Sequence, residues 1–224
     1  VVLGGDADGS GSGNIVPTRG MAGDAYGLQD EFIPADIYYS GLDGTWDDDE
    51  DGVYGESGEE DLLAEVFVGR IAADNIPELE KFVNKIIMYQ NQPVIEDLEK
   101  ALMVGELLWA DPTYGGDYKD EVAYGAETHG YTTSGFPDNF QINKLYDRDA
   151  DWSQQDVYDE FSLAGVNLLN HLGHCGVTYH MTLENSDITT SNFQNDGTNR
   201  SFVIDYSQGC YCGSFDNRGP NGDY

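Results

Sequence analysis

The stretch Phe202-Val-Ile-Asp-Tyr-Ser-Gln-Gly-Cys210-Tyr-Cys212-Gly213-Ser-Phe215 is the most informative part of this sequence. Its apolar start predicts a buried strand, and its glycines allow a sharp turn that presents a cysteine at the strand end. A second predicted strand, Val166-Asn-Leu-Leu169, leads into Asn170-His171-Leu172-Gly173-His174. If the two strands are parallel neighbours, their carboxyl ends bring a thiol and an imidazole together at the edge where open α/β sheets carry active sites.

This pairing predicts a Cys/His catalytic dyad. Cys210 is the candidate nucleophile, because Gly209 and Gly213 flank it in the turn. Cys212 competes with it, but in an extended segment the two side chains face opposite sides and only one can meet His174. His171, three residues earlier, is interpreted as structural.

The rest of the chain predicts strands that alternate with helices, and hence an α/β fold with a mostly parallel sheet covered on both faces. Residues 20–61 read as one long acidic loop region. Further strands are predicted at 65–68, 101–104 and 140–146. Helices are predicted over 118–128 and 187–193. Two more helices are predicted to begin near Asp74 or Asn75 and at Ser153, the latter with a capping box completed by Asp156.

The composition is strongly acidic, with 42 Asp and Glu against 10 Lys and Arg and a formal charge of −32. That balance excludes nucleic acid as a partner, because phosphate binding relies on basic side chains. No apolar run is long enough for membrane insertion. The start at Val1-Val2-Leu3 reads as a strand without an initiator Met or a signal peptide, which suggests a processed fragment.

Several motifs carry a family resemblance. Gly173-His174 followed by Cys210-x-x-Gly213-x-Phe215 resembles the active site of the gingipain-type cysteine peptidases, relatives of caspases and legumain. The other matching landmarks are Gly4-Gly5-Asp6, Val16-Pro17-Thr18-Arg19, Ala35-Asp36-Ile37-Tyr38-Tyr39, Leu42-Asp43-Gly44 and Glu65-Val66-Phe67-Val68-Gly69-Arg70-Ile71. The resemblance implies a caspase-like fold: one catalytic domain over residues 1–224, with an acidic first lobe (1–90) and a catalytic lobe (95–224). It further implies that other domains of a longer chain are partners.

The resemblance also assigns roles. It selects Cys210 and His174 as the dyad, and it makes Glu106, at the end of the 101–104 strand, the residue that orients the histidine. Relatives have Gly directly after the histidine to help bind the oxyanion, whereas this chain has Cys175 and then Gly176. Either Gly176 has taken over that role or the oxyanion site is impaired. Asp117 lies near the position where arginine-specific relatives read the P1 side chain.

The acidic run predicts bound Ca²⁺. Asp47-x-Asp49-x-Asp51-Gly52 matches the first half of an EF-hand loop, and position twelve is Gly58, so the motif is incomplete. Asp43, Glu56 and Glu59 are further candidate ligands, and Asp6-x-Asp8-Gly9-Ser10 is a weaker second site. The alternative is a solvated acidic surface, as in proteins adapted to high salt.

Two further alternatives remain open. His171, His174, Cys175 and His180, together with Cys210 and Cys212, form a possible zinc ligand set, although their spacing matches no compact zinc module. The main prediction is a Ca²⁺-stabilised cysteine endopeptidase, extracellular or at the cell surface, that cleaves protein or peptide substrates through a thioester. The alternative is an inactive structural or adhesive module with the peptidase fold.

Overall fold

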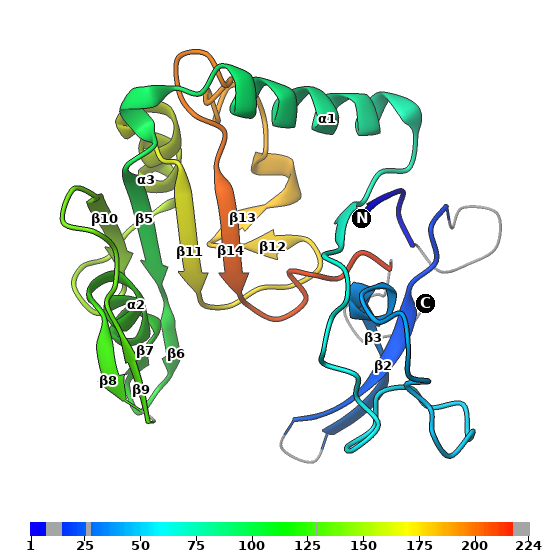
Figure 1. Cartoon of the computed structure of the whole chain (residues 1–224). Helices are drawn as coiled ribbons and strands as arrows, with labels where there is room; N and C mark the ends of the chain where they lie inside the picture. The colour runs from blue at the N-terminus through cyan, green and yellow to red at the C-terminus, as the bar shows by residue number, and fades with distance from the viewer. Residues whose placement is uncertain (8–14, 26–27, 129, 217–224) are drawn as a thin grey trace. The chain divides into compact units, whose positions relative to one another are not determined.

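The computed structural model describes residues 1–7, 15–25, 28–128 and 130–216 (Figure 1). The chain divides into two compact units. One is formed by Val1–Val83 with the described residues from Gly213 on, and the other by Asn84–Cys212. The lobe boundaries inferred from the sequence, at residues 90 and 95, stay a prediction.

A four-stranded parallel sheet forms the centre of the second unit (Figure 1). Its order is β10 (Gln141–Tyr146), β5 (Lys100–Gly105), β11 (Leu168–Leu172) and β14 (Ile204–Gln208). The register pairs Leu172 with both Gly105 and Gln208, so β5, β11 and β14 end level with one another. This confirms the predicted parallel sheet and the predicted pairing of the strand before His174, β11, with the strand before Cys210, β14.

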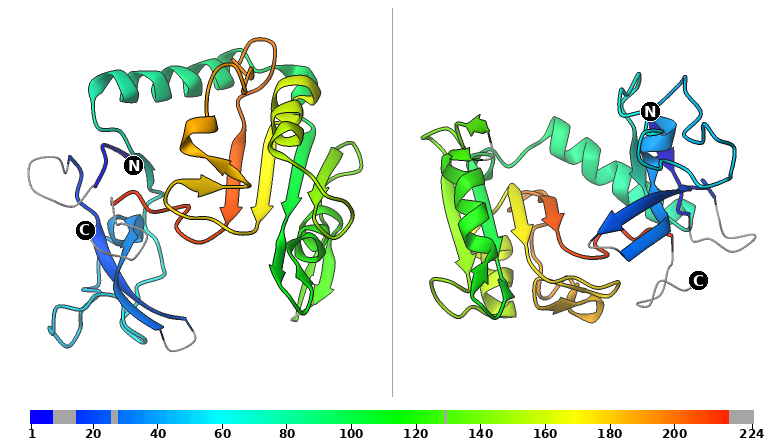
Figure 2. Two further views of the ribbon diagram at one scale, coloured as in Figure 1. Left: turned by 180° about the vertical axis from the view of Figure 1, so that it is seen from behind. Right: turned by 90° about the horizontal axis from the view of Figure 1, so that it is seen from below.

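Helices cover both faces of this sheet (Figure 2). The strand β5 alternates between them. Met103 packs in a cluster with Ala123 of α2 (Gly115–Tyr124), while Leu102 packs in a cluster with Val157 of α3 (Gln154–Asp159). All these apolar side chains are almost fully buried. Burial of each large aliphatic side chain stabilises the fold by about 1.5–3 kcal/mol, so β5 anchors the sheet edge that follows it.

Two helix starts follow the sequence prediction. The capping box of α3 is present, with Ser153 and Asp156 satisfying each other's backbone N–H groups. The helix continues into a π-helical turn, Glu160–Ala164. The long helix α1 (Ile76–Asn91) is preceded by Asn75, whose Oδ1 accepts the Glu78 N–H at 3.1 Å and so caps the helix start.

Two other helix predictions were wrong in extent. The helix predicted over 118–128 ends at Tyr124, because Gly125 adopts a φ of 87° and terminates it. Only a 3₁₀ turn, η5 (Asn185–Asp187), forms where a helix was predicted over 187–193. The remaining short elements of this unit are η3 (Ile95–Asp97) and three antiparallel pairs: β6 (Leu107–Trp109) with β7 (Thr113–Tyr114), β8 (Ala126–Thr128) with β9 (Tyr131–Thr133), and β12 (Tyr179–His180) with β13 (Leu183–Glu184).

The first unit corrects two further predictions. The presumed loop over 20–61 contains most of a hairpin, β2 (Arg19–Ala25) with β3 (Leu28–Ala35), and η2 (Asp36–Tyr39). The strand predicted at 65–68 forms instead at β4 (Gly69–Ile71), parallel to β1 (Val2–Gly4). Polar and glycine residues hide the hairpin's alternation. None of the described helices is long and apolar enough to cross a membrane.

One ion pair joins two of the family landmarks within this unit. Arg70 donates from Nε and Nη2 to the two carboxylate oxygens of Asp36, at 2.7 and 2.6 Å. Its Nη1 also donates to the backbone carbonyls of Gly5 and Val16. A bidentate, largely buried guanidinium of this kind fixes orientation as well as contributing energy, so Arg70 ties four chain segments together.

Candidate active site

Three predicted catalytic residues follow three adjacent parallel strands of the second unit. Glu106 comes directly after β5, His174 two residues after β11, and Cys210 two residues after β14. Because these strands end level, the three residues share the carboxyl edge of the sheet. This is the edge at which open α/β sheets bind their substrates.

Glu106 fixes the backbone at His174 through a hydrogen bond. Its Oε2 accepts the His174 N–H at 2.6 Å, and its side chain is buried, with the residue only 4% exposed. Burial by itself raises the pKa of Glu106, but the neighbouring His171 ring and the His174 N–H outweigh it, and the net pKa is lowered. Glu106 is therefore a buried carboxylate that stays ionised at neutral pH.

A backbone carbonyl sets the tautomer of His174. Its Nε2 lies 2.9 Å from the carbonyl oxygen of Leu107. A carbonyl oxygen only accepts, so Nε2 carries the proton and Nδ1 keeps the free lone pair of the neutral ring. Nδ1 is thus the nitrogen that can take a proton from a thiol.

Close approach explains the two glycines that frame the site. A Cβ at Gly173 would lie 2.5 Å from the Glu106 carboxylate and 2.5 Å from His171 Nε2. A Cβ at Gly209 would lie 2.0 Å from the Sγ of Cys175. Any larger side chain at either position would displace a site residue, so both positions require glycine for space.

The two cysteines of the turn are both exposed, and neither forms a disulfide. Tyr211 between them has a φ of 58°, so the segment is a turn, and the extended alternation assumed from the sequence does not apply. The two thiols differ in their contacts, because the Cys212 thiol is directed to the carbonyl oxygen of Gly209 at 3.0 Å. Within the described residues, Cys210 and His174 make no hydrogen bond with each other, and the dyad stays a prediction.

The predicted oxyanion residues lie in a folded-back turn. The Gly176 N–H donates to the carbonyl oxygen of Tyr179 at 2.9 Å, so it is already engaged. The Cys175 side chain points to β14, with Sγ 3.8 Å from Ser207 Oγ. Burial raises the pKa of the Cys175 thiol to about 11, which keeps it protonated at neutral pH. The oxyanion roles of Cys175 and Gly176 remain predictions.

Sequence reasoning missed one polar residue of this edge, Ser207. Its Oγ lies 2.8 Å from His171 Nδ1 and 3.0 Å from His180 Nε2, so it links β11 to β12. Residues two apart in a strand share a face, so β14 puts Ser207 on the same face as Asp205. This alternation is the sequence signal from which Ser207 could have been predicted. Burial lowers the pKa of His180 to about 4, so that ring is neutral near pH 7.

Asp117, the candidate for reading the P1 side chain, already has a partner. It lies in the first turn of α2 with its side chain 59% exposed, and Arg148 Nη1 donates to it at 2.6 Å. Arg148 also pairs with Asp120 and Asp149. A basic substrate side chain would have to compete with Arg148 for this carboxylate.

A buried lysine ties β11 to β14 beneath the site. Lys119 is 1% exposed, and its Nζ donates to Asn170 Oδ1 at 2.6 Å and to Gln208 Oε1. Burial lowers its pKa to about 8. Since an unfolded lysine titrates near pH 10.4, the unfolded chain binds more protons between these two values, and stability rises with pH there.

We therefore expect the free energy of unfolding to rise by about 2 kcal/mol between pH 7.5 and 9.5 through this one group. Urea titrations at the two pH values measure it. Lys119→Met removes the titration and should flatten the rise by that amount, whereas the exposed control Lys81→Met should keep it. Equal slopes in all three proteins would show that Lys119 is not the cause.

The acidic run of the first unit brings its carboxylates together. Asp47, Asp49 and Asp51 form one group of potential ligand atoms within 4.8 Å, and Asp49 also joins Glu56 and Glu59 in a second. Two buried oxygens, Asp47 Oδ1 and Glu59 Oε2, lack a hydrogen-bond donor in the described structure. Asp43 belongs to a separate group, with Asp61 and Glu65. The second candidate calcium site lies outside the described residues at positions 8–10.

Glu56 shows the electrostatic cost of this crowding. Its pKa is raised, first by partial desolvation and then by the charges of Asp51, Glu59 and Asp49. Oxygen ligands on a turning loop are what a hard divalent cation such as Ca²⁺ requires. The donor set and the two unpartnered oxygens fit such an ion.

The parallel sheet, its two helical layers and the acid, histidine and cysteine at one edge define a cysteine-peptidase-type fold. A profile of peptidase family C25 matches residues 1–223. The chain belongs to peptidase family C25.

Solved structures agree with this fold. The complex of the pro- and mature domains of RgpB from Porphyromonas gingivalis matches with a TM-score of 0.61 and 20% identity, over 98% of this chain and 43% of that one. The Arg-specific cysteine proteinase gingipain R (RgpB) matches with a TM-score of 0.62 and 19% identity, over 96% and 41%. The chain thus spans less than half of either structure's chain. Among curated proteins, no sequence matches it significantly.

Proposed function

We propose that the protein is a cysteine endopeptidase, extracellular or at the cell surface, in which Cys210 is the nucleophile and His174 the proton carrier. The observation that carries this proposal is the shared sheet edge: Glu106, His174 and Cys210 follow three neighbouring parallel strands. The family match over nearly the whole chain supports it.

The proposed reaction proceeds in two stages, acylation of Cys210 and hydrolysis of the thioester, with His174 transferring the proton in each. Nδ1 of His174 takes the thiol proton of Cys210, and the thiolate attacks the scissile carbonyl carbon. The proton then passes to the departing amine, which leaves a thioester on Cys210. Nδ1 next removes a proton from water, and the hydroxide attacks the thioester carbon. The C–S bond breaks, the carboxylic acid leaves, and the Cys210 thiolate takes the proton back from Nδ1. Throughout, the Leu107 carbonyl keeps the proton on Nε2, and Glu106 acts as a positioning residue.

The substrate preference can be read from a peptide mixture. Incubation of the protein with a diverse peptide library under reducing conditions should give internal cleavages, which mass spectrometry maps to the P1 residue. If Asp117 reads P1, cleavage should follow Arg and Lys, and Asp117→Asn should reduce those sites selectively by about tenfold or more, because a paired carboxylate loses its charge. Arg148→Ala frees Asp117 and should raise the same cleavages. An unchanged pattern in both variants would remove Asp117 from the substrate site.

We also propose that the acidic run binds a stabilising Ca²⁺. Asp47, Asp49, Asp51 and Glu56 supply carboxylate oxygens, and Glu59 adds a buried one. Five acidic side chains in residues 47–51 repel one another, and a divalent ion relieves that repulsion while it orders the loop. Asp43 is assigned to a neighbouring carboxylate group.

Removal of calcium should therefore lower stability without altering the dyad. At a hundredfold excess over its Kd, an ion that binds only the folded state adds about 2.7 kcal/mol. Thermal melts with Ca²⁺ and with chelator, at fixed ionic strength, measure the loss. Asp49→Asn should abolish the calcium effect because Asp49 belongs to both groups, while the exposed Asp138→Asn should retain it. A melting temperature that follows total salt but ignores Ca²⁺ would leave a solvated acidic surface.

The alternative is an inactive extracellular module with the same fold, and one observation favours it. The position after His174 is Cys175, and the next N–H, of Gly176, is already bonded to Tyr179. If the Gly176 N–H is the oxyanion donor, its bond to Tyr179 removes it, and loss of one such donor costs acyl transfer about 10²–10³ in rate.

A further inference from the structure

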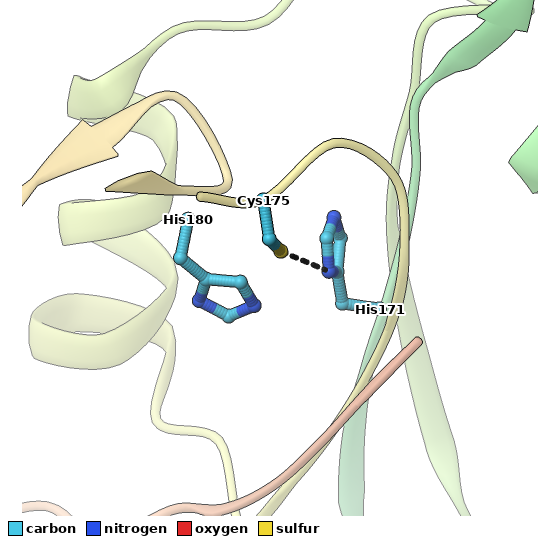
Figure 3. A group of neighbouring side chains, drawn as sticks. All are labelled: His171, Cys175 and His180. Carbon is cyan, nitrogen blue, oxygen red and sulfur yellow. Dashed lines mark hydrogen bonds between the residues drawn. The ribbon is translucent and has the colours of Figure 1, made fainter. Parts of the chain in front are cut away.

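Three side chains of types that ligate metals converge in the second unit (Figure 3). His171 comes from β11, Cys175 from the following loop and His180 from β12, and their potential ligand atoms all lie within 4.8 Å of one another. Sγ of Cys175 lies 4.0 Å from His171 Nδ1, and the two imidazole rings meet edge to face with centroids 4.7 Å apart. His171 is fully buried, and the other two are half-buried.

The backbone fixes this convergence. Cys175 and His180 face each other across an isolated antiparallel bridge, and the Gly176 N–H bonds to Tyr179 within the same turn. The Cys175 side chain also packs against Gly209, where even a methyl group has no room. The turn that carries Cys175 and His180 is therefore fixed by its backbone hydrogen bonds and by its packing against Gly209.

A fourth potential ligand atom, the hydroxyl oxygen of Ser207, lies near all three. Ser207 Oγ is 2.8 Å from His171 Nδ1, 3.0 Å from His180 Nε2 and 3.8 Å from Cys175 Sγ. Zn–N and Zn–S bonds of about 2.0 and 2.3 Å place tetrahedral ligand atoms about 3.3–3.6 Å apart. The Cys175 Sγ to His171 Nδ1 separation of 4.0 Å and the three Ser207 Oγ separations lie within about 1 Å of those values, a difference that side-chain rotation can supply.

A carboxylate stands behind each imidazole. Glu106 Oε1 lies 3.6 Å from His171 Nε2, and Asp205 Oδ2 lies 3.9 Å from His180 Nδ1. The first two atoms are both buried, and neither has a hydrogen-bond partner in the described structure. Metal-bound histidines usually donate their second ring N–H to a carboxylate, which orients the ring. This is the second, independent indication of a metal site.

We propose that His171, Cys175 and His180 bind one Zn²⁺, with Ser207 Oγ or a water molecule as fourth ligand. Imidazole and thiolate suit zinc, whereas Ca²⁺ and Mg²⁺ require oxygen ligands. Binding releases the thiol proton of Cys175 to solvent, and the nearby carboxylates of Glu106 and Asp205 balance the remaining positive charge. Of the six residues considered from the sequence, only these three form the group; His174, Cys210 and Cys212 lie outside it.

The site is tested with Co²⁺ as a spectroscopic substitute for Zn²⁺. The folded protein should bind one equivalent with a thiolate-to-cobalt charge-transfer band, and Zn²⁺ should displace it. Cys175→Ser should remove the band and lower Zn²⁺ affinity at least tenfold. The matched double variant Cys210→Ser/Cys212→Ser should keep both, whatever its peptidase activity.

Two results would overturn the proposal: a folded protein that binds neither ion at micromolar concentration, or a charge-transfer band that survives Cys175→Ser and disappears in the double variant. Circular dichroism reports whether each variant folds. If Cys175→Ser does not, His180→Gln decides, since it should lower Zn²⁺ affinity while the charge-transfer band persists at saturating Co²⁺. Zn²⁺ affinity unchanged by His180→Gln would equally refute the site.

Discussion

Replacement of Cys210 by Ala should abolish peptide hydrolysis, with a loss of at least about 10³-fold in kcat/KM, because it removes the thiol that forms the thioester. The residual rate would come only from substrate binding and any oxyanion contacts. Initial rates on the best library substrate, with protein concentration determined by absorbance, give the ratio of kcat/KM between the native protein and the variant. The folded state should be unchanged, since Cys210 is exposed.

Cys212→Ala is the matched control, two residues away in the same exposed turn. Its thiol is directed to the Gly209 carbonyl, so its loss should cost less than about tenfold, through a slightly looser turn. Equal losses in the two variants would argue against a single nucleophile and in favour of a shared metal or structural role.

Removal of the Glu106 carboxylate should produce the second largest effect. Glu106→Ala leaves the His174 N–H without its acceptor and removes the buried carboxylate 3.6 Å from His171 Nε2, so we expect a loss of about 2–4 kcal/mol in stability. Activity should fall by about 10²-fold through kcat, because His174 loses its support. Glu106→Gln keeps an acceptor and should recover much of both, while the exposed control Glu96→Ala should change neither.

The pH dependence gives a readout that loss of packing alone would not produce. The pKa of Glu106 is lowered in the folded state, so its contribution to stability is present above its unfolded pKa, near 4.3, and is lost as pH falls through the lower folded value. Denaturant titrations from pH 6 to 3 should therefore show a smaller acid loss in Glu106→Gln than in the native protein. Parallel curves would assign Glu106 a purely steric role.

The sequence predicted the part of the fold where apolar strands alternate with helices. Val166–Leu169 and the Phe202 strand carry enough apolar residues for their parallel pairing to be inferred. The burial predicted for the second of them was wrong, because β14 is mostly exposed. The hairpin formed by β2 and β3 was missed because Gly, Asp and Glu dominate it, and β-propensity depends on context. The end of α2 was placed too late because Gly125 acts through its backbone φ, which composition does not reveal.

The site shows the same division. Strand ends alone predicted that His174 and Cys210 share one edge, and the family resemblance added Glu106. The tautomer of His174 depends on the Leu107 carbonyl, and the Gly176 N–H is occupied by Tyr179; neither contact follows from residue types. The grouping of His171, Cys175 and His180 depends on a turn whose strands are two residues long, too short to give a periodic signal.

The most direct test of the central claim is covalent labelling by a peptidyl reagent that reacts only with an activated thiol. Peptide mapping by mass spectrometry after brief exposure should find the label on Cys210 in the native protein, with Cys175 and Cys212 unmodified. In His174→Ala the labelling rate at Cys210 should fall by about 10²-fold or more, because the thiol loses its base. Labelling that distributes over Cys210 and Cys212 at rates independent of His174 would contradict the dyad and leave the inactive module.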